Sequence, residues 1–175
     1  EREIEQFVIR MLALRQPMAA DLRLIVAAMK ITGDLERIGD YAANAAKRSI
    51  VLSQFPPGFT LSGLGTMLRL AQAQLKAIID AIAENDVAKA IEVWKGDSEL
   101  DDVYNTVFRE LITYMMEDPR TISTSLDIIW FAKAIERIGD HAKNICEQVI
   151  YIVKGTDVRH TKPAVLETDK GAAPV

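Results

Sequence analysis

The pentapeptide Glu-Arg-Ile-Gly-Asp occurs twice in this chain, at residues 36–40 and again at residues 136–140. The longer windows 36–50 and 136–150 are identical at eight of fifteen positions. Self-similarity over such a long period indicates two copies of one supersecondary unit. In each copy Glu, Asp and Asn fall at positions i, i+4 and i+8, which lie along one side of a helix. The duplicated element therefore carries a stripe of two carboxylates and one amide.

Hydrophobic periodicity predicts helices along most of the chain and almost no strands. Apolar residues at helical spacing predict a short helix near residues 4–12 and a long helix over 18–54. Further helices are predicted over 61–84, 87–116 and 121–153. Proline, glycine and Asn-Asp pairs separate these segments, as expected for turns. The sequence therefore predicts an all-α protein.

The apolar spacing also indicates how the two copies are organised. The pattern of residues 4–12 recurs in residues 107–115, an offset of 103. On this register the second unit, residues 61–154, has three helices, and the first unit, residues 1–54, lacks its first helix and part of its second. We expect residues 55–60 to be a linker and residues 155–175 to be a poorly ordered C-terminal tail.

Composition excludes several classes of protein. Apolar residues at 49% and charged residues at 26% are typical of a globular chain. No apolar run approaches the ~18 residues of a membrane span. The net charge of −4 argues against broad nucleic-acid binding, and a lone cysteine, Cys146, excludes an internal disulfide. Glycine loops for phosphate and the common hydrolase motifs are missing from the sequence, which favours a binding protein over an enzyme.

A second acidic pair lies on the apolar face of the helix predicted over 87–116. Asp97 and Asp101 are four residues apart, and burying unpaired carboxylates costs several kcal/mol, so we expect a cation beside them. Glu136 and Asp140 would face this pair from a neighbouring helix. Facing carboxylates are how helical bundles bind hard or borderline cations. The candidate metal ligands, including those of the first copy, are Glu36, Asp40, Asp97, Asp101, Glu136 and Asp140.

Ordinary explanations compete with a metal site. A Glu-x-x-x-Asp pair on a helix is more often a solvated surface pair, and Lys143 lies three residues after Asp140, as in a plain salt bridge. The duplication and the additional acidic pair favour a cation. Gly39 and Gly139 lie inside predicted helices, where glycine costs about 1 kcal/mol relative to alanine, so we expect close helix approach there. We expect His141 at the surface or rim, because the first copy has tyrosine at that position.

Several segments resemble the PhoU family. They are Leu-Arg-Gln-Pro-Met-Ala-Ala-Asp-Leu-Arg at 14–23, Asp-Leu-Glu-Arg-Ile-Gly-Asp at 34–40, Ala-Ile-Glu-Arg-Ile-Gly-Asp-His-Ala-Lys-Asn-Ile at 134–145, and Tyr-Ile-Val-Lys-Gly-Thr-Asp-Val-Arg-His at 151–160. The resemblance covers nearly the whole chain. It implies tandem three-helix bundles related by a pseudo-twofold axis, with the first bundle incomplete here.

The resemblance also implies a function. Members of the family bind iron, zinc, magnesium or manganese through Glu/Asp-x-x-x-Asp motifs, which match the six candidate ligands. They are bacterial cytoplasmic negative regulators of phosphate uptake and of the phosphate-starvation response, and they perform no catalysis. The implied partners are a phosphate ABC transporter and a sensor histidine kinase, with contact to the membrane only through those partners and none with nucleic acid.

Two other functions remain open from the residues. A carboxylate-bridged helical-bundle metalloenzyme would be expected to carry Glu-x-x-His motifs, and the sequence has none. A structural oligomerisation module would bind no metal. The apolar face of the helix over 18–54 lacks cover helices in the incomplete first unit, so we expect a homo-oligomer, a dimer or larger, with the first units at the interface.

Overall fold

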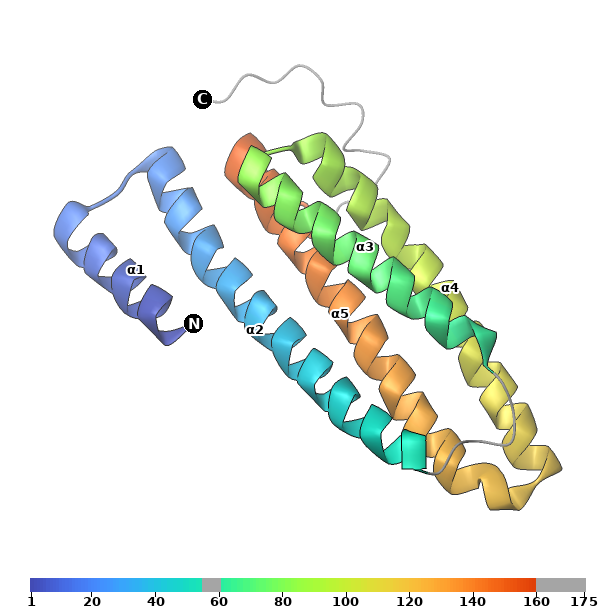
Figure 1. Cartoon of the computed structure of the whole chain (residues 1–175). Coiled ribbons are helices and arrows are strands. Elements are labelled where there is room, and N and C mark those ends of the chain that lie inside the picture. Colours follow the sequence, from blue (N-terminus) through green and yellow to red (C-terminus); the bar gives the residue numbers. More distant parts are fainter. Residues whose placement is uncertain (55–60, 160–175) are drawn as a thin grey trace.

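The computed structural model describes residues 1–54 and 61–159, which fold into five α-helices and one short 3-10 helix (Figure 1). No strand occurs in this part of the chain, so the all-α prediction is confirmed. The elements are α1 (Arg2–Arg15), α2 (Ala19–Gln54), α3 (Ser62–Glu84), α4 (Val87–Glu117), η1 (Pro119–Thr121) and α5 (Ile122–Lys154).

Local chemistry explains where the helices end. Asn85 closes α3 with a left-handed backbone at φ 52°, a conformation that asparagine tolerates. The next residue, Asp86, begins α4, because its side chain accepts a hydrogen bond from the backbone N–H of Lys89. Gly155 ends α5 at φ 72°, where glycine has no Cβ to clash. These breaks were predicted from the sequence, whereas the single turn η1 was not.

The two helices that carry the repeat lie side by side and antiparallel (Figure 1). Arg48 of α2 contacts Asp127 of α5, and Asp34 of α2 contacts His141 of α5. Tyr41 occupies the same place in the first copy as His141 does in the second, and their rings stack with centroids 5.7 Å apart. The two copies therefore meet at equivalent positions, as a pseudo-twofold arrangement requires.

Helices α3, α4 and α5 form a three-helix bundle, α2 packs along α5, and α1 contacts α2 alone among these helices. One apolar cluster joins α2 to the bundle around Ile38, Trp94 and Ile145. The other lies inside the bundle around Leu100 and Ile135. The second unit thus has its three predicted helices, while the proposed domain limits stay a prediction.

The segment after α5 contributes to the core at one residue. Val158 is 1% exposed and belongs to the cluster that joins α2 to the bundle. It lies within the stretch that we expected to be a poorly ordered tail, so the start of that stretch packs against the helices. The rest of the predicted tail, from residue 160, and the predicted linker at 55–60 lie outside the described residues.

Several large apolar side chains of α1 and α2 remain exposed. Phe7 and Leu14 of α1 are 61% and 73% exposed, and Leu24 of α2 is 50% exposed. Ile38, on the expected apolar face of α2, is buried against α5 and its neighbours. The long helix α2 therefore buries one part of its apolar surface and leaves another part exposed.

No helix in the described ranges is both long enough and apolar enough to cross a membrane.

Candidate metal centre

Three of the predicted ligands meet between α4 and α5. Asp101 of α4 and the pair Glu136 and Asp140 of α5 each place one carboxylate oxygen within 4.8 Å of the others. The spacing of four residues puts both carboxylates of α5 on the side that faces α4. Across the residues that the structure describes, this trio is the one group of three such side chains at metal-binding distance. We call it the acidic trio.

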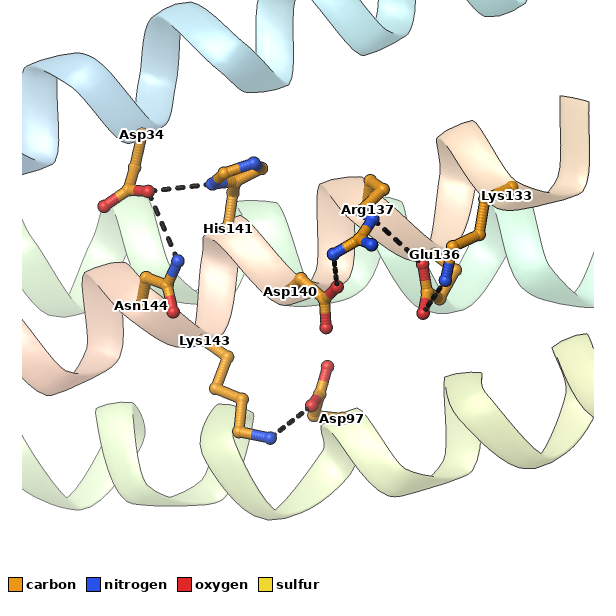
Figure 2. Close-up of polar contacts among 9 residues, drawn as sticks. All are labelled: Asp34, Asp97, Lys133, Glu136, Arg137, Asp140, His141, Lys143 and Asn144. Carbon is orange, nitrogen blue, oxygen red and sulfur yellow. Dashed lines mark hydrogen bonds and ion pairs between the residues drawn. The ribbon is translucent and has the colours of Figure 1, made fainter. Parts of the chain in front are cut away.

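Asp97, the fourth predicted ligand of this unit, lies in the same interface but has a cation of its own. Its carboxylate is 3% exposed, and Oδ2 accepts a hydrogen bond of 2.7 Å from Nζ of Lys143 (Figure 2). Burial lowers the pKa of Lys143, but its hydrogen bond to Asp97 and the nearby carboxylates outweigh that effect, so the pKa is raised. The cation expected beside the buried aspartates is, for this residue, a lysine.

Two further cations, both on α5, bind carboxylates of the acidic trio. Nζ of Lys133 donates to Oε1 of Glu136 at 2.6 Å, and Nη1 of Arg137 donates to Oδ2 of Asp140 at 3.1 Å (Figure 2). Nε of Arg137 also lies 3.9 Å from Oε2 of Glu136. Although Arg137 directly follows the glutamate and its Cβ points about 100° away around the helix, its long side chain bends back to reach both carboxylates. The trio keeps one carboxylate more than these two cations balance.

The trio shows signs of this uncompensated charge. Burial raises the pKa of Asp101, and the charges of Asp97 and Asp140 raise it further. Burial also raises the pKa of Glu136, although the hydrogen bond from Lys133 opposes the shift. Oε2 of Glu136 is buried without a hydrogen-bond partner in the described structure. A buried carboxylate oxygen with no donor fits a cation ligand, and oxygen ligands suit hard cations.

Close packing at the motif glycine is confirmed in the second copy alone. A Cβ on Gly139 would lie 2.4 Å from Cδ2 of Leu100 and 3.1 Å from Oε1 of Gln74. A Cβ on Gly39 would meet nothing within 4 Å. The difference arises because α5 is covered by α3 and α4 at this level. In the described part of the chain, α2 has no equivalent cover there.

Gln74 was not singled out from the sequence. It lies on α3 in the apolar spacing set by Met67, Ala71 and Ile78, and it is 8% exposed. Both polar atoms of its side-chain amide are buried and lack hydrogen-bond partners among the described residues. A glutamine within an apolar stripe was the available signal. Its position against Gly139 places it behind the acidic trio.

The first copy of the motif is arranged differently. Glu36 and Asp40 both lie on the exposed side of α2. The described first unit brings no third carboxylate or histidine to them at metal-binding distance. Metal binding by these two residues, like that by the four residues of the second unit, stays a prediction.

The structure contradicts the expectation that His141 lies at the surface. It is 8% exposed and lies between α2 and α5, where its Nδ1 is 2.8 Å from Oδ1 of Asp34 (Figure 2). Nδ2 of Asn144 donates to the same oxygen at 3.4 Å. The contact uses Asp34, a residue just before the repeated pentapeptide, so the two copies are joined by polar as well as apolar contacts.

Comparison with known proteins places these features in a family. The model of the PhoU domain matches residues 1–49 and 64–149. A phosphate-specific transport system accessory protein PhoU homolog from Caulobacter vibrioides is 46% identical, over 93% of this chain and 71% of its own length. The homolog from Pseudomonas aeruginosa is 48% identical, over 91% of this chain and 66% of its own length.

Solved structures agree with this match. The crystal structure of PhoU from Pseudomonas aeruginosa has a TM-score of 0.83 at 46% identity, covering 89% of this chain and 75% of that chain. A phosphate transport system regulatory protein PhoU from Streptococcus pneumoniae has a TM-score of 0.78 at 29% identity, with 90% and 77% covered. The family model, the relatives and the fold agree, and this chain belongs to the PhoU family.

Proposed function

We propose that this protein is a negative regulator of phosphate uptake and of the phosphate-starvation response. It would act on the cytoplasmic side by binding a phosphate ABC transporter and a sensor histidine kinase. The observation that carries this proposal is the 46% identity, over 93% of the chain, to an accessory protein of the phosphate-specific transport system. The regulatory name of the Streptococcus pneumoniae structure supports the same role.

The acidic trio fits a metal ion, and it is where we would place one. Asp101, Asp140 and Oε2 of Glu136, which lacks a hydrogen bond in the described structure, would be the ligands. A bound iron, zinc, magnesium or manganese ion would supply positive charge and link α4 to α5. Lys133 already donates to Oε1 of Glu136, and Arg137 donates to Oδ2 of Asp140. These hydrogen bonds orient the two carboxylates. Asp97 stands next to the trio with Lys143 as its partner.

A regulatory role fits this centre better than catalysis by a carboxylate-bridged metalloenzyme. Such enzymes take histidine as well as carboxylate ligands from their bundle helices. The acidic trio consists of carboxylates alone, and His141 turns instead toward Asp34 on α2. We therefore assign the centre a structural part in a protein that works by binding others.

A reporter experiment tests the proposed function. The full-length gene is deleted in its own host, and a phosphate-starvation promoter drives a reporter in phosphate-rich medium. Deletion should release the promoter from repression, and the restored gene should silence it again. The same strain grown without phosphate controls for a working reporter. A reporter that stays silent in the deletion strain in rich medium, while responding to starvation, would overturn the proposal.

A further inference from the structure

A groove with a volume of about 680 Å³ runs between α2 and α5, on the part of these helices away from the His141 contact with Asp34. Its described lining comes from these two helices only. The volume is within the ~300–1,000 Å³ of typical ligand sites. The residues that give it chemical character are four cations, one acid and one tryptophan: Lys47, Arg48, Lys133, Arg137, Asp127 and Trp130. We call it the basic groove.

The charge of the basic groove is opposite to that of the whole protein. Four cations and one carboxylate line it, whereas the chain carries a net charge of −4. The one acid is already bound, because Nη1 of Arg48 lies 3.1 Å from Oδ1 of Asp127. Lys47 is exposed and forms no ion pair with any residue in the described ranges. Two other cations of the lining are paired as well, Lys133 with Glu136 at 2.6 Å and Arg137 with Asp140 at 3.1 Å. Lys47 is therefore the one cation of the described lining whose charge has no carboxylate partner in the described ranges.

The groove also contains an exposed aromatic anchor. Trp130 is 60% exposed, and the guanidinium of Arg48 lies 5.7 Å from the centre of its ring. Tryptophan and arginine are the residue types most enriched where binding energy concentrates in interfaces. A site built around both would take a ligand with an apolar part as well as negative charge.

The internal repeat supplies a comparison within the same molecule. A second groove, of about 400 Å³, lies between the equivalent stretches of α2 and α5. The lining of this second groove has two acids, Asp34 and Glu147, where the basic groove has one, and it has no tryptophan. The basic and aromatic character of the first groove therefore does not follow from the fold alone. The counterparts at an offset of 100 are Lys47 and Glu147, Arg48 and Gln148, and Trp130 and Lys30.

We propose that the basic groove binds an acidic, extended peptide segment that carries at least one apolar side chain. The groove follows α2 from Tyr41 to Val51, a rise of about 15 Å, which an extended chain covers in about five residues. Lys47 offers an unpaired ammonium along that length. Arg48, Lys133 and Arg137 keep N–H donors beyond those bonded to their own carboxylate partners, so the groove presents donors to several carboxylates of a peptide. The apolar side chain would rest on Trp130. That the segment belongs to a partner in phosphate regulation rests on the proposed function, whereas its chemistry does not.

A peptide fits this groove better than a nucleotide or a phosphate ion. The described lining lies within helices, where backbone N–H groups are already bonded along the helix. The groove therefore has no cradle of free amides of the kind that holds phosphates. An inorganic phosphate would fill a small part of about 680 Å³ and would leave Trp130 in water.

Fluorescence anisotropy of purified protein tests the proposal. The probe is the peptide Asp-Glu-Leu-Asp-Glu-Leu-amide with carboxyfluorescein on its N-terminal amine, and the control peptide carries the same label and has Asn and Gln in place of the acids. The acidic peptide should bind at least tenfold more tightly, and added salt should weaken it. Lys47→Glu and Trp130→Ala should each weaken binding at least tenfold. The matched control is Lys30→Glu, which changes the counterpart of Trp130 in the second groove and should leave binding within twofold.

The outcomes separate this proposal from the proposed function. Equal binding of the two peptides, or equal losses in Lys47→Glu and Lys30→Glu, would overturn the groove as an acidic-peptide site. Tighter binding of ATP or of phosphatidylglycerol vesicles that depends on Lys47 would also overturn it, in favour of those ligands. Circular dichroism of each variant verifies the fold. The deletion reporter tests the proposed function without using this peptide. The two proposals are therefore tested by independent measurements, and one can fail while the other holds.

Discussion

The ammonium group of Lys143 lies 2.7 Å from Oδ2 of Asp97, the most buried of the four carboxylates gathered between α4 and α5. This contact divides the predicted four-ligand site into an ion pair and the acidic trio. The lysine neutralises the carboxylate that solvent reaches least. The trio keeps the partly exposed side chains of Asp101 and Asp140, to which an ion from solution has access.

The acidic trio should bind metal, and its loss should be selective. In the double variant Asp101→Asn, Asp140→Asn, two anionic ligands are replaced by neutral amides of similar shape, so bound metal should fall below a tenth of the wild-type amount. Elemental analysis after reloading purified apo-protein measures it. The matched control is Asp80→Asn, Glu84→Gln, an acidic pair at the same spacing on α3 that lies outside the predicted ligands, and it should change bound metal little. Unchanged stoichiometry in the first variant would rule out the site.

Removing the lysine partner should destabilise the metal-free protein. Lys143→Met leaves Asp97 buried without its cation, and breaking a buried pair costs about 3–5 kcal/mol. We expect about 2 kcal/mol, because the Lys143 side chain is 37% exposed and water screens part of the interaction. Urea unfolding in chelator measures the change, with Lys47→Met as the control. Adding Asp97→Asn should recover part of the loss, and no recovery would mean that packing, not charge, was responsible.

The pH dependence of stability should change sign with metal. Burial raises the pKa values of Asp101 and Glu136 in the folded state. A carboxyl group with a raised folded pKa disfavours folding while it is ionised, so the unfolding free energy of the apo-protein should rise as pH falls from 7 toward the range just above ordinary carboxyl pKa values. With metal bound, protons compete for the ligands and stability should fall instead.

Urea unfolding at several pH values, with chelator and then with saturating metal, provides that measurement. The Asp101→Asn variant controls for the assignment, because it should flatten the apo slope. An apo-protein that loses stability steadily from pH 7 to pH 5.5 would contradict the expectation.

Periodicity was enough to predict the helices and the meeting of Asp101 with Asp140, because both depend on which face of a helix a residue occupies. It did not predict the contact of Arg137 with Asp140, since a long flexible side chain reaches well beyond the direction of its own Cβ. The burial of His141 depends on how α2 crosses α5. The way the two helices cross is set by packing between segments far apart in the sequence. The hydrophobic periodicity of one helix therefore cannot predict it.

The two motif glycines should respond in opposite directions to alanine. A methyl group at Gly139 would lie 2.4 Å from the side chain of Leu100, which is fully buried and has little room to move. Overpacking of this kind costs about 1–3 kcal/mol. At Gly39 a methyl group meets nothing, so Gly39→Ala should stabilise by up to about 1 kcal/mol through helix propensity. Thermal or urea unfolding of both variants measures the pair, and equal effects would contradict the difference in packing.

The 175-residue chain should self-associate through α1 and the neighbouring face of α2. Phe7 and Leu24 are 61% and 50% exposed there, and α1 packs on α2 alone among the described helices (Figure 1). Covering such side chains stabilises by about 25 cal/mol per Å² of apolar surface removed from water, so a second copy is the nearest available cover. Light scattering at micromolar concentration should show a dimer or larger. The double variant Phe7→Glu, Leu24→Glu should shift the chain toward monomer. The control Ile79→Glu changes a side chain of α3 that is 49% exposed, and it should leave the association unchanged. A wild-type chain that is monomeric throughout this concentration range would exclude the interface, because the apolar face would then remain exposed to solvent without driving association.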